Sequence, residues 1–189
     1  MTNKKNLLQL LHKYSPSETY AEWLRAAQNV HVRADKETRA LEIEAHFPSL
    51  MDKTNLYILE QKICEAYQIH MAHFRVHYPA ELFDVDYLPQ VFLEAERRGG
   101  ICRGFFNHYH AQIFDNRIEI RISFYDSGVS LVRYAKTPGL LSDIIFEEFG
   151  LRYEVMLLQD ESFEEDYASF ERMTLQQLQE MAPIPPSIL

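Results

Sequence analysis

The stretch that decides the fold is VHVRADKETRALEIEAHF, residues 30–47 of this 189-residue chain. Apolar and polar residues alternate on both sides of a polar break at Asp35 and Lys36. Alternation with a period of two is typical of strands that bury one face and leave the other in water. The stretch therefore predicts a β-hairpin, and its buried row is Leu41, Ile43, Ala45 and Phe47.

A second stretch of the same kind is AQIFDNRIEIRISF, residues 111–124, in which Asp115 and Asn116 favour a tight turn. Its predicted buried row is Ile118, Ile120, Ile122 and Phe124. Two helical patterns precede each hairpin, and a helix and then a strand follow it. The order thus recurs after about eighty residues. We expect an α+β protein of two small tandem modules, each with helices and a three-stranded sheet, in an order that is also that of type II KH-like modules.

The helical patterns of the first half are residues 6–14, 15–28 and 52–67, and the strand is 71–78. Those of the second half are residues 86–98, 101–109, 130–136 and 138–150, with a closing strand at 151–159. Ser15, Pro16 and Glu18 predict a capping box at the second helix. Thr137 is the predicted cap of the helix that Pro138 begins and Gly150 ends.

The composition is that of a soluble globular protein: 47% of the residues are hydrophobic, and the net charge is -9. An acidic protein is a poor autonomous ligand for nucleic acid, because phosphate binding favours a basic surface. No signal peptide and no apolar run long enough to cross a bilayer are present in the sequence, which predicts a cytoplasmic protein without membrane contact. Cys64 and Cys102 are expected to be free thiols.

The acidic stretch Asp84-Val85-Asp86, with Glu81 upstream, allows three interpretations: a metal site, a helix cap or a joint between the halves. Carboxylates at i and i+2 do not converge on a helix, so a two-metal site would need further ligands. Asp84 or Asp86 instead stands where a carboxylate can accept a hydrogen bond from the first turn of the next helix. We interpret the stretch as a joint that carries caps. No metal site, cofactor or catalytic constellation is predicted, and no small-molecule substrate is evident.

The stretch RRGGICRGFF, residues 97–106, is the most phosphate-like in the chain. Arg97, Arg98 and Arg103 are candidates for contact with a nucleic acid or an acidic partner. The glycine spacing departs from the G-x-x-G of nucleic-acid-binding KH domains. Gly99 and Gly100 are more simply the end of a helix.

The C-terminal part predicts an amphipathic helix at residues 161–182 and a Pro-rich linker at 183–189. The helix either packs on the second module or binds a partner, and the residues proposed for partner binding are Phe163, Tyr167, Phe170 and Leu178. The modules themselves are expected at 1–79 and 80–160.

Five strings, HFPSL, YPAELFDVDYLPQ, ERRGG, GFFN and LLSDIIFEEFGLRYEV, resemble in order and spacing the N-terminal region (the N-I and N-II domains) of the PolC-type α subunit of Gram-positive DNA polymerase III. The resemblance spans residues 7–159 and implies that the first module is similar to domain V of the clamp-loader tau subunit and the second is KH-like. It also implies a parent polypeptide with DNA-directed DNA polymerase and 3'-5' exonuclease activity, whose catalytic carboxylates lie outside this sequence.

The resemblance implies a non-catalytic interaction module that acts in chromosomal DNA replication, with replisome proteins such as tau or another holoenzyme component as partners. The alternative is a module that contacts template or single-stranded DNA through the arginines, with weak binding expected. A stand-alone enzyme is the third hypothesis, and the sequence favours binding or scaffolding over catalysis.

Overall fold

The computed structural model describes residues 6–100, 102, 105–122 and 136–159. The first half contains α1 (Leu7–Leu10), α2 (Glu18–Ala26), β1 (Gln28–Asp35), β2 (Ala40–His46), α3 (Lys53–Tyr67) and β3 (Met71–His77). The second half contains the short 3-10 turns η1 (Ala80–Leu82) and η2 (Val85–Tyr87), then α4 (Leu88–Arg97), β4 (Tyr109–Phe114), β5 (Arg117–Ile122), α6 (Thr137–Phe149) and β6 (Glu154–Gln159).

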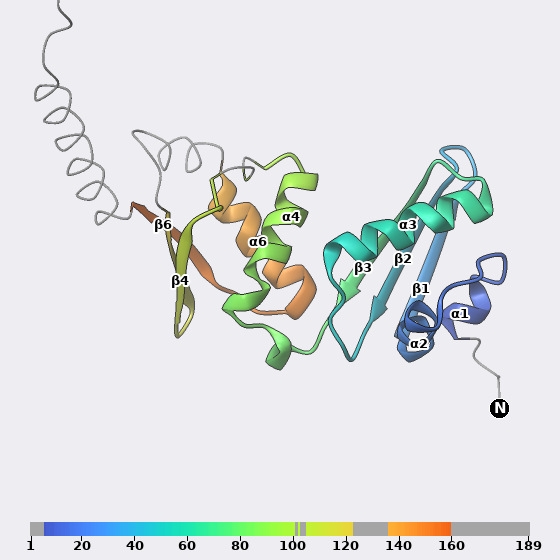
Figure 1. Cartoon of the computed structure of the whole chain (residues 1–189), viewed down its shortest axis with the longest axis horizontal. Helices are drawn as coiled ribbons and strands as arrows, with labels where there is room; N and C mark the ends of the chain where they lie inside the picture. Colours follow the sequence, from blue (N-terminus) through green and yellow to red (C-terminus); the bar gives the residue numbers. More distant parts are fainter. Residues whose placement is uncertain (1–5, 101, 103–104, 123–135, 160–189) are drawn as a thin grey trace, which may run out of the picture.

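Each half contains one three-stranded sheet, and the two sheets have the same topology. In each, the first two strands form an antiparallel hairpin, and the third strand adds in parallel to the second after a helical crossover. This confirms the α+β class and the repeated order of hairpin, helix and strand. In Figure 1 the sheets lie toward opposite ends of the molecule, with α4 and α6 between them.

The first core forms on the face of the hairpin that the alternation predicts. Ile43, Ala45 and Phe47 are buried, and the ring of Trp23 from α2 stacks on Phe47 with centroids 3.6 Å apart. The indole N–H of Trp23 donates to the backbone carbonyl of Ser49, so the ring is buried without leaving its donor unpaired. On α3, one apolar stripe faces this layer: Leu56, Leu59 and Ile63.

The second core also follows the prediction. Asp115, with a positive φ of 46°, stands in the β4–β5 turn, and Ile118, Ile120 and Ile122 are fully buried. The apolar faces of α4 and α6 pack against this row: Leu88, Val91, Ala95, Leu141, Ile144 and Ile145. Phe124 and residues 130–135 lie outside the described part, as do residues 160–189 with the predicted C-terminal helix.

Two predicted helix starts are shifted. The helix after Ser15 begins at Glu18, with Ser17 as an N-cap whose side chain makes no capping bond. The capping box fails because the third helical residue from Ser17 is Tyr20, which offers no carboxylate. A complete box stands instead at Asn6 and Gln9.

In the second half, α6 already includes Thr137, and Lys136 precedes it with a positive φ of 57°. The predicted cap is therefore one residue too late, whereas Gly150 ends the helix as expected. The helix predicted at 101–109 is wrong for its described residues: 105–108 form a turn and a bend, and β4 begins at Tyr109. Tyr109 pairs with Ile122, so the β4–β5 hairpin includes a residue that was predicted to be helical.

Candidate functional site

The two halves meet along a seam where α3 begins, β3 ends, and α4 and α6 pass between the sheets. The backbone N–H of Tyr78 donates to the carbonyl of Glu148 at 2.7 Å, which joins the end of β3 to the last turn of α6. The side chain of Gln90 on α4 accepts from the backbone N–H of Lys53 at 2.7 Å. An amide of α4 thus caps the first turn of α3, a role that the side chain of Asp52 does not take.

A buried ion pair lies at the centre of the seam. The ammonium Nζ of Lys53 is 2.5 Å from Oε1 of Glu148, and these side chains are 2% and 4% exposed. The hydroxyl of Tyr87 donates to Oε2 of Glu148 at 2.9 Å, so both carboxylate oxygens have donors. Burial raises the pKa of Glu148, although the nearby Lys53 ammonium opposes that shift.

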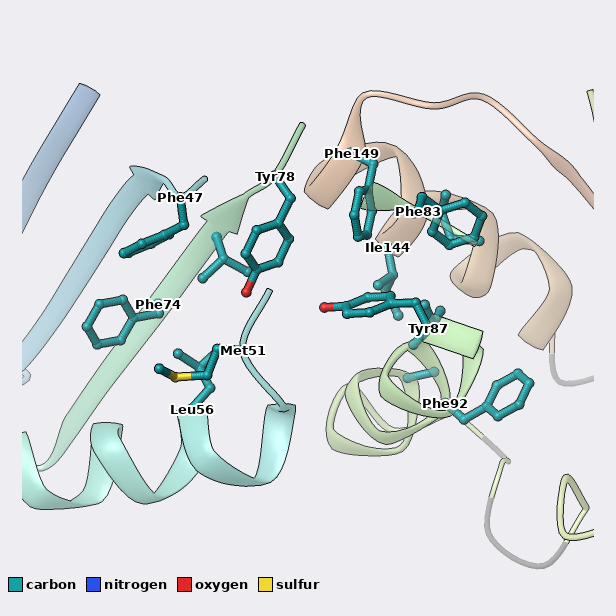
Figure 2. Close-up of a cluster of buried hydrophobic side chains, with 14 of the residues drawn as sticks. Phe47, Met51, Leu56, Phe74, Tyr78, Phe83, Tyr87, Phe92, Ile144 and Phe149 are labelled. Carbon is teal, nitrogen blue, oxygen red and sulfur yellow. The ribbon is translucent and has the colours of Figure 1, made fainter. Parts of the chain in front are cut away.

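The tyrosines of the seam are held in their protonated form. Burial and the nearby Glu148 charge raise the pKa values of Tyr78 and Tyr87. The protonated hydroxyl of Tyr87 remains a hydrogen-bond donor to Glu148. Figure 2 shows both rings between the apolar cores of the halves, beside Phe83 and Phe149. Tyr78 lies 5.5 Å from Phe149 between ring centroids, and Tyr87 lies 5.0 Å from it.

A second buried carboxylate, Glu94 on α4, is held by two further donors. The Tyr57 hydroxyl reaches Oε2 at 2.7 Å, and Nε of Arg98 reaches Oε1 at 2.8 Å. Burial alone would raise the pKa of Glu94, but the Lys53 charge and these hydrogen bonds hold it below its usual value. Arg98 also forms an ion pair with Glu147 at 2.8 Å, which ties α4 to α6.

The predicted arginine contacts lie beside this network. Arg97 pairs with Glu60 of α3 at 2.9 Å, and its guanidinium lies 4.5 Å from the Tyr57 ring centroid. Arg98 holds Glu94 and Glu147, as described above. The structure therefore brings Arg97 and Arg98 onto carboxylates of the chain itself. Arg103 lies outside the described residues, as do the partner-binding candidates Phe163, Tyr167, Phe170 and Leu178.

A cleft of about 520 Å³ opens over the seam. Lys53, Glu94 and Glu148 are among its lining residues, and its other walls include His46 and His77 at the strand ends. Nδ1 of His77 lies 2.8 Å from the carbonyl of Glu147, and Nε2 lies 3.1 Å from Oε1 of Glu44. The hydrogen bond with His77 lowers the pKa of Glu44. In the described residues, no three His, Cys, Asp or Glu side chains are grouped so that they could hold a metal ion.

The Asp84-Val85-Asp86 stretch lies at the joint, and Asp84 is a cap. Its carboxylate accepts from the backbone N–H of Asp86 at 2.9 Å and starts η2. The expectation that a carboxylate caps this entry is confirmed for Asp84 and wrong for Asp86. The chain makes two 3-10 turns before α4, so Tyr87 stands at the N-cap position of α4.

The predicted free thiols are found. Cys64 is half-buried in α3, whereas Cys102 is buried outside any helix. Burial raises the pKa of Cys102 to about 11, so this sulfur remains a neutral thiol at neutral pH.

Sequence reasoning missed the residues that form the seam, above all Lys53, Glu94 and Glu148. One signal was present: Glu94 lies three residues after Val91 and one before Ala95, on the apolar side of its helix. Glu148 follows Ile144 by four residues in the same way. A charge inside an apolar stripe indicates a buried carboxylate that needs partners, but it does not name them.

No family model matches the chain, and no curated protein matches it. Among solved structures, it is similar to the PrgH periplasmic domain, with 14% identity and a TM-score of 0.22 over 76% of this chain and 67% of the other. A second similar structure is the periplasmic domain of the T3SS inner membrane protein PrgH from S.typhimurium, with 14% identity and a TM-score of 0.23 over 76% and 74% of the two chains.

None of these comparisons supports the replicative-polymerase interpretation, which is corrected here. Neither family models nor curated proteins match, and the two structures named are periplasmic domains of an inner membrane protein. The expected PolC-type membership, the role in DNA replication, the replisome partners and the cytoplasmic location find no support in any comparison and are withdrawn, as is the DNA-binding alternative. The strings that carried the resemblance are explained by local structure. ERRGG forms the end of α4, and LLSDIIFEEFG is part of α6 with the glycine that ends it. Within the described residues, no helix combines the length and apolar character that spanning a bilayer requires.

Proposed function

We propose that this chain is a non-catalytic scaffold module that holds two three-stranded sheets in a fixed relative orientation. The observation that carries the proposal is the buried Lys53–Glu148 pair, because it joins the first turn of α3 to the last turn of α6 across the seam. Ion pairs at this depth stabilise little relative to apolar packing, but separating the two partners would leave a buried charge without compensation. A movement of one sheet relative to the other would separate this pair, so the pair favours a fixed orientation of the two sheets.

The lack of catalysis is part of this proposal. A catalytic acid, base or nucleophile must present an available group to a substrate. Both oxygens of Glu148 and both oxygens of Glu94 are occupied by donors of the chain itself. The raised pKa values of Tyr78 and Tyr87 keep their phenol groups from acting as bases. These contacts support a structural role for the polar residues on the cleft floor.

The division into modules also belongs to the proposal, with residues 1–79 as one module and 80–160 as the other. Each has one sheet face under helices and one open face with alternating polar residues, as β2 shows with its exposed Glu44 and His46. Each module has the order helix, hairpin, helix and strand, and this order supports the proposal that the modules are KH-like. The open faces are the surfaces that such a scaffold would offer to a partner.

The distance between the two hairpin turns tests the proposal. Spin labels are placed at the exposed positions Glu37 and Asn116, in a protein with Cys64→Ser and Cys102→Ala. Pulsed electron resonance should give one narrow distance distribution. Glu148→Ala should broaden it, whereas Glu154→Ala at an exposed position should not. A broad distribution in the labelled protein with an intact seam would overturn the proposal.

A further inference from the structure

The last residue of β3 is a histidine that contacts both halves of the molecule. Nδ1 of His77 lies 2.8 Å from the backbone carbonyl oxygen of Glu147 on α6, across the seam. Nε2 of the same ring lies 3.1 Å from Oε1 of Glu44 on β2. The next residue, Tyr78, donates its backbone N–H to the carbonyl of Glu148. In Figure 1, β3 ends beside α6, so His77 lies where the first sheet meets the second half.

Both atoms that face the ring of His77 can only accept hydrogen bonds. One is a backbone carbonyl oxygen, and the other belongs to Glu44, whose pKa is lowered chiefly by the hydrogen bond with His77. A neutral imidazole has one N–H group and one nitrogen lone pair, whereas an imidazolium has two N–H groups. Only the protonated ring can therefore donate to both partners. The neutral ring must turn a lone pair toward one of the two oxygens.

The other charged and titratable groups around His77 lie on five neighbouring elements, and most of them pair with one another. These pairs are Arg75 with Glu42, His73 with Arg97, Arg98 with Glu94 and Glu147, and Lys53 with Glu148. On β1, His31 lies opposite Glu44 in the strand register. On β2, His46 stacks on His77 with ring centroids 4.8 Å apart. A charge on His46 would oppose a charge on His77, so His46 needs a control of its own.

We propose that His77 is a pH-dependent link across the seam, which makes both of its hydrogen bonds when the ring is protonated and only one when the ring is neutral. Histidine changes its charge between about pH 5 and pH 8. The link is therefore complete at the acidic end of this range and weakens as the pH rises through it. The side chain of His77 is 27% exposed, so water replaces part of the lost contact and the effect is a few-fold change in opening.

The backbone amide of Tyr78 reports on this link, because its hydrogen bond to Glu148 crosses the seam beside His77. Its hydrogen exchange is measured in the full chain at about pH 5.5 and about pH 8, and each rate is compared with the intrinsic rate at that pH. The protection factor should fall at least about threefold between the two. In His77→Gln it should stay near the wild-type value at the higher pH, because an amide group has one donor nitrogen and one acceptor oxygen, as neutral imidazole has one of each.

His46→Gln is the matched control, because it removes the other ring of the stacked pair and leaves both partners of His77 in place. It should retain the fall in protection. Three results would overturn the proposal: a wild-type protection factor that does not fall, a fall that persists in His77→Gln, or a fall that is lost in His46→Gln. The proposal rests on the scaffold role proposed above. A flat profile would remove only the link at His77, whereas a broad spin-label distance would remove the scaffold itself.

Discussion

Lys53 and Glu148 are the residues on which the account depends most. Removing two charges from water costs several kcal/mol per ion, and their attraction returns this only if every remaining polar atom has a partner. Glu148 meets this condition through Lys53 and Tyr87. The loss of both partners should therefore cost less than the two single losses added together.

A double-mutant cycle measures this coupling. Glu148→Gln leaves the buried Lys53 ammonium without its hydrogen-bonded counter-ion, with only the charge of Glu94 nearby, so we expect a loss of about 3–5 kcal/mol in the free energy of unfolding. Lys53→Met should cost a similar amount. The double variant should cost less than the two single losses added together, because the two charges are removed together, although Glu94 still loses the Lys53 charge. Urea denaturation measures all three.

The matched control is Glu18→Gln, which removes the same charge from an exposed pair with Arg25. It should cost less than about 1 kcal/mol. If the two single seam variants were no more harmful than this control, the pair would not hold the seam.

The lowered pKa of Glu94 predicts that the stability of the protein depends on pH. Its pKa is held below the usual value in the native state, so its contribution to stability is present above the unfolded pKa of about 4.3 and is lost as the pH falls through the lower native pKa. Glu94→Gln should be less stable than the wild type by about 1–3 kcal/mol at neutral pH. The difference should shrink below about pH 4. Denaturation curves across this range check it, and a constant difference would contradict the assignment.

At the scale of elements, the end of α4 shows how glycines set the path of the chain. The N–H of Gly100 donates to the carbonyl of Ala95, and the N–H of Gly99 donates to that of Glu96, which is the Schellman pattern. Gly99 has a φ of 86°. A Cβ on Gly100 would lie 2.8 Å from the Ala95 oxygen and 2.9 Å from Cδ2 of Leu140.

Three alanine substitutions should therefore differ in sign. Gly99→Ala should cost about 1–2 kcal/mol through its positive φ. Gly100→Ala should cost about 1–3 kcal/mol, because α6 is packed close behind it. Gly139→Ala, inside α6 with no atom near the new Cβ, should stabilise the protein by about 0.5–1 kcal/mol. Thermal unfolding measures all three, and equal effects would contradict this account.

The elements were predictable where a periodic pattern meets a clear end signal. The rows around Ile43 and Ile120, the turn at Asp115 and the stop at Gly150 could all be predicted from the sequence. The N-cap residues of helices were less predictable. Several neighbouring polar residues can each act as the N-cap, and the backbone dihedral angles decide which one does. Ser15 against Ser17 shows this difference.

At the scale of the whole molecule, the site could not be predicted. Lys53 and Glu148 are separated by 95 residues and meet only because the halves pack against each other. Helical periodicity places each charge on an apolar face, but it does not show which apolar face lies opposite. The seam is therefore a property of tertiary packing, whereas the two sheets are properties of local patterns.

The most direct measurement of the central claim is native-state hydrogen exchange at β2 and β5, the central strands of the two sheets. If the seam makes one rigid unit, amides of both strands should open with the same free energy, equal to that of global unfolding. Glu148→Gln should lower both by the same amount. Separate opening energies for the two strands, or a variant that affects one sheet and spares the other, would contradict the account.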